Sequence, residues 1–286
     1  MSHGGVPGAD AAGVPVAGRK VSGVRAAPPV SAGRGKADAL PKISKGRRAP
    51  GDEACAAALA PLDFKEAPRI GLLGDTGGGK TRAAREIVLA YLRRATGLVA
   101  IVDAKGERRF DDLPVTPPPE VRISPADYAA RPVQPGCRVV IFRVGMMGEV
   151  NPEEIAHFTA ALAERKWGSL TVNDELDQAV TEGHWKSRSV FMPRMFVRGR
   201  TAGLAQLWGT VSPHEVPRQA FEQSSEIWCF KMAGVGLRLL REREYLNGIE
   251  AGTIEQLAGY PLPPEERGEF VRLQRGRAWD GKIYKF

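Results

Sequence analysis

The sequence predicts an α/β fold in which helices flank a mainly parallel central sheet. Three observations lead to this prediction: short apolar runs of strand length recur, segments with helical spacing separate them, and 43% of the 286 residues are hydrophobic. Uninterrupted apolar runs are typical of strands that are buried on both faces, and strands that alternate with helices form parallel crossover units. A C-terminal β-hairpin and a disordered N-terminal tail complete the expected fold.

Residues 1–60 are predicted to be a disordered basic tail, ahead of one folded domain at 61–286. The first 50 residues are rich in Gly, Ala and Pro, and their nine lysines and arginines against two aspartates supply most of the net charge of +8. Such a composition buries too little apolar surface to offset the entropy of ordering. The tail is either a nucleic-acid-binding arm or a solvated segment that docks a protein partner.

The first half of the domain is predicted to begin with a strand, a glycine-rich loop and a helix. Its expected elements are strands at 70–73, 98–102 and 139–142 and a helix at 80–94. Each strand is a short apolar run, and the helix combines good helix formers with Gly97 beyond its end as a stop. The proline-rich stretch 114–135 predicts a surface excursion with at most one short strand.

The second half continues the alternation. Its expected elements are helices at 151–166, 190–200 and from about 216, and strands at 170–172, 204–208 and 227–230. Asn151 is a typical cap and Pro152 a typical first-turn residue of the first of these helices. The segments 268–273 and 282–286 are predicted to pair as a hairpin, with a turn near Gly281.

Cysteine usage and hydropathy exclude several classes of protein. Cys55, Cys137 and Cys229 lie far apart, with no CxxC pair and no nearby histidine group, so no zinc site is indicated. This pattern favours a reducing cytosol. No apolar stretch has the length of a signal peptide or a membrane span, so we expect a cytoplasmic protein without a transmembrane segment.

One segment matches the phosphate-binding pattern GxxxxGK[ST] in full and lies between a predicted strand and a predicted helix. It consists of Gly74, Asp75, Thr76, Gly77, Gly78, Gly79, Lys80 and Thr81. The glycines let main-chain N–H groups point at the phosphates of a nucleotide, and the helix N-terminus adds partial positive charge. Lys80 is expected to bridge the phosphates, and the Thr81 hydroxyl to ligate Mg2+. The alternative is a glycine-rich turn that binds no nucleotide.

Two adjacent carboxylates follow the predicted strand at 170–172. Asp174 is expected to hold the metal, and Glu175 to act as the general base for the attacking water. An ordinary acidic helix start would give the same residues, and Asp177 and Glu182 are weaker substitutes. Because the chain has an acid beside the metal residue and lacks an NKxD-type base reader, hydrolysis of ATP with Mg2+ is favoured.

Two further stretches, together with the loop and the carboxylate pair, point to a family. Residues 103–107, Asp-Ala-Lys-Gly-Glu, are similar to a D-x-K-G-E stretch after the second strand. Residues 199–230 are similar to a run of GR-x-x-G, TQ-x-P, a short helix and an apolar strand. In these four features the chain resembles the HerA/FtsK superfamily of ring-forming DNA-pumping ATPases, which includes the packaging ATPases of viruses and phages.

The resemblance implies a RecA-like P-loop NTPase fold and roles for two more residues. Thr210 would be the polar sensor at the end of its strand, although Val211 stands where the family's glutamine follows. Arg200 would be an arginine finger that reaches the γ-phosphate of a neighbouring subunit. The rival fingers are Arg194, Arg198 and Arg218. Any one of these arginines can instead form a surface salt bridge.

The resemblance also implies a motor that assembles into a homo-oligomeric ring, a pentamer or hexamer, and translocates double-stranded DNA. The short ATPase core favours a viral genome-packaging ATPase of the host cytoplasm or the virion, with a capsid portal or vertex protein as partner. A cellular or plasmid DNA translocase of the same superfamily, and a P-loop ATPase that drives a protein assembly or export complex without DNA, are the alternatives. Lys186, Arg188 and Arg194 either contact DNA or belong to a solvated loop.

Overall fold

The computed structural model describes residues 51–103, 109–111, 113, 138–143, 169–179, 191–264 and 266–286, all within the unit Gly46–Phe286. Several sequence predictions lie outside the described residues. They are the tail at 1–50, the excursion at 114–135, the helix at 151–166, the 104–107 part of the family-like stretch, and the residues Cys137, Glu182, Lys186 and Arg188. Among the described helices, none is both long and apolar enough to cross a membrane.

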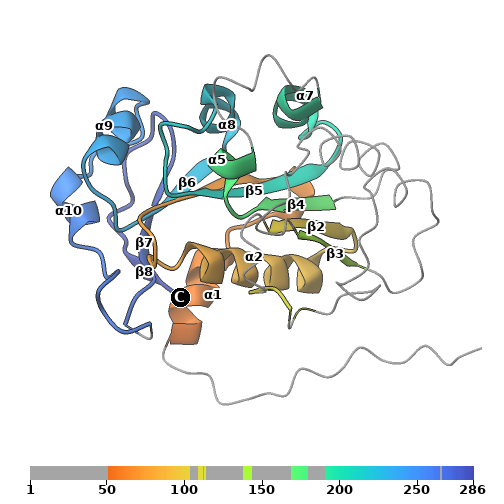
Figure 1. The fold of residues 1–286 in the computed structure, drawn as a ribbon, viewed down its shortest axis with the longest axis horizontal. Coiled ribbons are helices and arrows are strands. Elements are labelled where there is room, and N and C mark those ends of the chain that lie inside the picture. The colour runs from red at the N-terminus through yellow and green to blue at the C-terminus, as the bar shows by residue number, and fades with distance from the viewer. Residues whose placement is uncertain are drawn as a thin grey trace, which may run out of the picture. The chain divides into compact units, whose positions relative to one another are not determined.

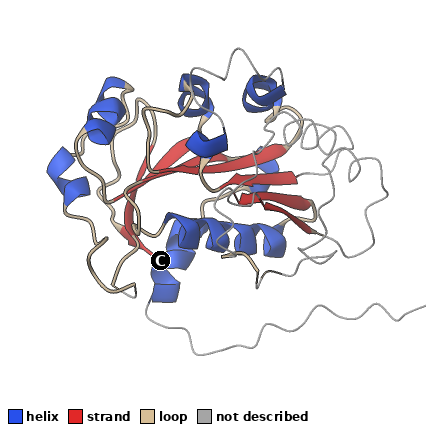
Figure 2. Cartoon of the chain, viewed as in Figure 1, coloured by secondary structure: helices blue, strands red, loops and turns tan. Residues whose placement is uncertain are grey.

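Within the described part of the chain, eight strands form one sheet in the order β3-β2-β4-β5-β1-β6-β7-β8. The strands of this sheet are red in Figure 2. The strands are β1 Arg69–Leu73, β2 Leu98–Asp103, β3 Val139–Arg143, β4 Ser169–Asn173, β5 Leu204–Thr210, β6 Glu226–Phe230, β7 Glu269–Leu273 and β8 Tyr284–Lys285. All strand pairings from β3 to β6 are parallel, whereas the pairings of β6 with β7 and of β7 with β8 are antiparallel. The predicted mainly parallel sheet with a C-terminal hairpin is confirmed.

Helices cover both faces of this sheet (Figure 1). They are α1 Gly51–Leu59, the short 3-10 helix η1 Phe64–Glu66, α2 Lys80–Arg94, α5 Leu176–Ala179, α7 Phe191–Arg198, α8 Arg218–Gln223, α9 Val235–Glu242 and α10 Ala251–Glu255. One apolar cluster joins α1 and α2 to the sheet, and a second joins α7, α8, α9 and α10 to the opposite face. The bounds of α2 agree with the sequence prediction.

Successive residues of a strand contribute to opposite clusters, which explains the uninterrupted apolar runs. In β1, Ile70 and Leu72 pack in the α1–α2 cluster, whereas Leu73 packs in the other. In β6, Trp228 and Cys229 divide in the same way. Because side chains alternate across a strand, a sheet that is covered on both faces needs apolar residues at every position.

Five of these helices were not expected from the sequence: α1, η1, α5, α9 and α10. Helix α1 lies ahead of residue 61, where the sequence predicts the folded domain to begin, and its Ala58 and Leu59 are buried against the core. The overall composition of the tail masked a short alanine-rich segment with high helix propensity. Helices α9 and α10 bury only a few apolar side chains each, such as Leu237 and Leu240 in α9, so their periodic signal is short.

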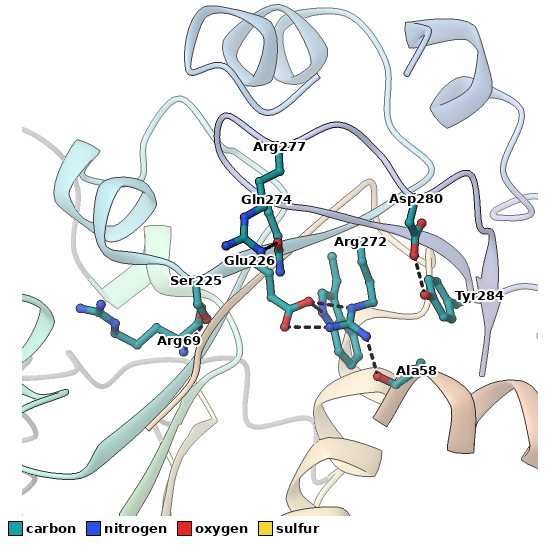
Figure 3. A network of polar contacts seen from close by, with 10 residues as sticks. Ala58, Arg69, Ser225, Glu226, Arg272, Gln274, Arg277, Asp280 and Tyr284 are labelled. Carbon is teal, nitrogen blue, oxygen red and sulfur yellow. Dashed lines mark hydrogen bonds and ion pairs between the residues drawn. The ribbon is translucent and has the colours of Figure 1, made fainter. Parts of the chain in front are cut away.

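A buried ion pair fastens the C-terminal hairpin to the rest of the sheet (Figure 3). Arg272 of β7 donates from Nε to Glu226 Oε2 over 2.7 Å and from Nη2 to Glu226 Oε1 over 3.0 Å. Trp228 Nε1 donates to the same carboxylate over 3.0 Å, and Arg272 Nη1 donates to the carbonyl oxygen of Ala58 over 3.2 Å. The network therefore joins β6, β7 and α1.

Candidate functional site

The phosphate-binding pattern forms the loop between β1 and α2, at the carboxyl ends of the parallel strands. Gly77 has φ of +76° and Gly79 has φ of +107°, in the region that favours glycine. A Cβ atom at Gly79 would also lie 2.8 Å from the Cα atom of Gly268. No side chain caps α2, which begins at Lys80, so the N–H groups of its first turn remain available to an anion.

Lys80 places a positive charge inside this loop. Its side chain is buried, with 6% of the residue exposed, and Nζ donates to the carbonyl oxygens of Gly74 over 2.7 Å and of Asp75 over 3.1 Å. A phosphate in the loop would offer charged oxygens to the same ammonium group, and charge-assisted hydrogen bonds are stronger than those to neutral carbonyls. The loop therefore suits an anionic ligand.

Thr81 and Asp174 meet although 93 residues separate them in the sequence. The Thr81 hydroxyl lies 3.2 Å from both carboxylate oxygens of Asp174, which follows β4. Because β5 lies between β1 and β4, the carboxylate reaches the loop across β5. Gly209 of β5 permits this approach, since a Cβ atom there would lie 2.5 Å from the carbonyl oxygen of Asp174.

The Thr81 and Asp174 oxygens fit a magnesium ion. Neighbouring ligands of an octahedral Mg2+ ion with bonds of about 2.1 Å lie about 3 Å apart, close to the spacing observed here. Magnesium in nucleotide sites is usually held by one or two protein oxygens, with phosphate oxygens and water as the other ligands. Among the described residues, no group of three or more His, Cys, Asp or Glu side chains gathers.

A pocket of about 590 Å3 opens over the loop. Its described lining residues are Thr76, Gly77, Gly78, Gly79, Lys80, Thr81, Arg82, Arg109, Glu175, Val211, Tyr260, Pro264, Arg267 and Gly268. Glu175 thus faces the pocket, whereas the adjacent Asp174 contacts Thr81. Their separate roles, a metal ligand for Asp174 and a general base for Glu175, remain predictions.

Thr210 lies beside the loop but does not line the pocket. It is fully buried at the end of β5, opposite Leu73 of β1. Its hydroxyl donates to Asp177 Oδ1 over 2.6 Å and accepts a hydrogen bond from the Ser212 N–H group over 2.9 Å. Because Asp177 belongs to α5, which begins directly after Glu175, Thr210 is linked to the segment that carries the predicted general base. Its sensor role remains a prediction.

The structure does not bring Arg200 to the loop of its own chain. Arg200 precedes β5, and its guanidinium lies 3.7 Å from the carboxylate of Glu66, which precedes β1. Both residues are therefore at the amino ends of the parallel strands, and the pocket is at the carboxyl ends. Of the rival arginines, Arg218 forms an ion pair with Glu222 over 2.6 Å. The side chain of Arg194 is not among those that the structure describes.

Several pocket residues were not predicted from the sequence. Arg109 lies two residues beyond the family-like stretch 103–107, so its position in the chain could have indicated it. Tyr260 and Arg267 lie between α10 and β7, in a segment without a recognisable pattern.

Near the loop, burial and the negative charge of Asp75 raise the pKa of the Cys229 thiol, so this cysteine is a packing residue and not a nucleophile.

Comparison with known proteins supports the same architecture. By sequence, no protein-family model and no curated protein matches the chain. By structure, the chain is similar to the genome packaging NTPase B204 from Sulfolobus turreted icosahedral virus 2 in complex with ATP-gammaS, with a TM-score of 0.55, 14% identity, and coverage of 78% of this chain and 98% of that one.

The complex of the same NTPase with AMPPCP gives a TM-score of 0.56 at 14% identity, over 77% of this chain and 98% of that one. The DNA-packaging ATPase B204 from Sulfolobus Turreted Icosahedral Virus gives 0.55 at 14% identity, over the same shares. At this identity the likeness concerns the fold. The chain has the P-loop NTPase fold of these packaging proteins, which confirms, for the fold, the resemblance that its sequence indicates.

Proposed function

We propose that the chain is an ATPase that uses hydrolysis to translocate double-stranded DNA, and that the DNA is a viral genome entering a preformed capsid. One observation carries the enzymatic part of this proposal: Lys80, Thr81 and Glu175 line one pocket and Asp174 contacts Thr81, although these residues come from two segments of the chain. A glycine-rich turn without a nucleotide would need neither the distant carboxylates nor the buried ammonium group.

The positions of these side chains support hydrolysis of a triphosphate. The loop N–H groups and Lys80 hold the β- and γ-phosphates, and Thr81 and Asp174 supply oxygens for Mg2+, which would neutralise phosphate charge. Glu175 faces the same pocket and takes the proton of the attacking water. Thr210 holds Asp177 and thereby steadies the start of α5, which follows Glu175 directly.

The DNA part of the proposal draws on two supports. The similar solved structures are named as genome packaging and DNA-packaging enzymes, and their fold extends over nearly the whole of those chains. In addition, the first 50 residues of this chain hold most of its positive charge, and lysine and arginine release counterions when they bind DNA phosphates.

The site also favours a ring, because Arg200 is exposed near the amino ends of the parallel strands, whereas its own pocket lies at their carboxyl ends. The side chains of Arg200 and Glu66 are 62% and 73% exposed, so their mutual attraction is weak, and a γ-phosphate of a neighbouring subunit would compete with it readily. We therefore assign Arg200 as a finger in trans. An Arg200→Ala subunit should be inactive alone and should regain activity when mixed with Lys80→Ala subunits.

The decisive test compares the ATPase rate of the full chain with and without linear duplex DNA, with Lys80→Ala as the inactive control. Stimulation by duplex, together with displacement of a third strand annealed to it, is the expected result. Hydrolysis that duplex DNA leaves unchanged would refute the DNA motor and favour an ATPase that acts on a protein complex. Full ATPase activity in the Lys80→Ala variant would refute the assigned site.

A further inference from the structure

The segment 258–268, between α10 and β7, is fastened against the phosphate-binding loop. The Gly268 N–H group donates to the carbonyl oxygen of Ala258 over 3.2 Å, and the Ala258 N–H group donates to Glu269 Oε2 over 2.9 Å. These two bonds close the segment into a loop of its own. Its Gly268 end lies so near Gly79 that a side chain at Gly79 would collide with it.

Tyr260 of this segment is a large aromatic residue that is exposed to 66% and lines the pocket. Its Cβ atom lies 3.5 Å from the position that a Cβ atom of Gly77 would take. Lys231 Nζ donates to the Tyr260 carbonyl oxygen over 3.3 Å, which fixes the backbone beneath the ring. The ring is therefore held at the wall of the phosphate-binding pocket without being buried in the core.

Arg267 connects this ring to the loop. Its Cζ atom lies 5.3 Å from the centre of the Tyr260 ring, within the range of a cation–π contact. Its Nη1 atom lies 3.1 Å from the ideal Cβ position of Gly77, and its Nε donates to the Leu262 carbonyl oxygen. A guanidinium group that is bonded in this way limits the orientations of the neighbouring ring.

A pocket of about 590 Å3 is of the size that takes a whole small ligand, and the phosphates account only for the part at the loop. The nucleoside end of the ligand needs an apolar surface. An aromatic face supplies it by stacking, because every nucleobase has a π-face. Among the described lining residues, Tyr260 is the one aromatic side chain.

We propose that Tyr260 stacks against the base of the bound nucleotide and that Arg267 is a positioning residue that orients the Tyr260 ring. The inference rests on the proposed function, because it assumes that the loop holds the phosphates of a nucleotide. The segment 258–268 then takes the nucleoside end of the ligand, and the glycine-rich loop takes the phosphate end.

The test compares two ligands, one with a base and one without. Tyr260→Ala should weaken binding of Mg-AMPPCP, an ATP analogue, by roughly tenfold to a hundredfold, and should leave binding of Mg-tripolyphosphate unchanged. Tyr260→Phe should bind both ligands as the wild type does, because the phenyl ring keeps its stacking face. Ile283→Ala, which changes an exposed apolar residue outside the described pocket lining, is the control and should alter neither affinity.

The role of Arg267 is tested by a double-mutant cycle. Arg267→Ala should weaken Mg-AMPPCP binding more in the wild type than in the Tyr260→Ala background, because its effect passes through the ring. Equal effects in the two backgrounds would overturn the positioning role.

Three results would overturn the stacking role: an unchanged affinity of Tyr260→Ala for Mg-AMPPCP, an equal loss for both ligands, or a changed oligomeric state that accounts for the loss. The last would place Tyr260 in a subunit interface. A wild-type protein that binds neither ligand would instead refute the proposed function. The two failures are therefore distinguishable.

Discussion

Gly79→Ala adds one methyl group where the phosphate-binding loop touches the segment 258–268. Gly79 has φ of +107°, and a residue other than glycine held in such a sparsely populated region costs about 1–3 kcal/mol. The new Cβ atom would also lie 2.8 Å from the Cα atom of Gly268. Because carbon atoms in contact lie about 3.5 Å apart or more, the two backbones must separate by about 0.7 Å.

A displacement of this size at the phosphates matters more for catalysis than for folding. A misplacement of about 1 Å costs catalysis about 100-fold, so we expect kcat/KM for ATP to fall by about that factor. The strain is smaller than the total stability of an ordinary domain, about 5–15 kcal/mol, so the variant should fold. Steady-state hydrolysis and thermal melting measure the two effects on the same sample.

Gly281→Ala is the matched control, because it carries backbone strain without a collision. Gly281 has φ of +75°, and a Cβ atom there would have no neighbour within 4 Å. This variant should lose stability and keep wild-type kcat/KM. If Gly79→Ala hydrolysed ATP as fast as Gly281→Ala, the close approach of Gly79 and Gly268 would not shape the site, and the reasoning would be refuted.

Three changes test other parts of the molecule. Glu175→Gln should bind Mg-ATP as the wild type does, which filter binding measures. Its kcat should fall by roughly 100- to 10,000-fold, because an amide cannot accept the proton of water, and single-turnover hydrolysis measures this loss. Arg272→Ala leaves the buried Glu226 carboxylate without its ion-pair partner, so the free energy of unfolding, measured in urea, should fall by about 3–5 kcal/mol. Arg275→Ala, which breaks the exposed pair with Glu244, is the control and should lower it by less than about 1 kcal/mol. Burial raises the pKa of both Tyr91 and Tyr245 from 10.0 to about 12, so stability should fall as the pH rises from 10 to 12, because these phenols ionise first in the unfolded chain. Between pH 10 and 12, melting curves should show a smaller loss of stability for Tyr91→Phe than for the wild type. An equal loss in both proteins would contradict the raised pKa of Tyr91.

Local patterns in the sequence were sufficient for the elements of the sheet and for the loop. Uninterrupted apolar runs identify β1, β2 and β6 because a doubly covered sheet buries every position of its strands. The start of α2 at Lys80 follows from the glycine pattern, whose spacing is local. The hairpin of β7 and β8 was likewise predicted, although β8 is only two residues long, Tyr284–Lys285.

Composition and short signals misplaced other parts. The composition of the whole N-terminal segment led to the prediction that residues 51–60 belong to the tail. The structure instead has helix α1 there, and its Ala58 and Leu59 pack against the core. Helices α9 and α10 are so short that the spacing of their apolar residues cannot be told from a chance arrangement. Where a segment buries only two or three side chains, tertiary packing decides its structure and the sequence pattern alone does not.

Residue types in local patterns were enough to propose Lys80, Thr81, Asp174 and Glu175 as the phosphate-binding, metal-binding and catalytic residues. Which distant groups meet depends on the tertiary structure. Because β5 lies between β1 and β4, Asp174 reaches Thr81 across Gly209, whereas Arg200, which precedes β5, lies near the amino ends of the strands and away from the pocket that Tyr260 and Arg267 line. Strand order and the close approach of glycines depend on the packing of the whole chain, and no local pattern encodes them.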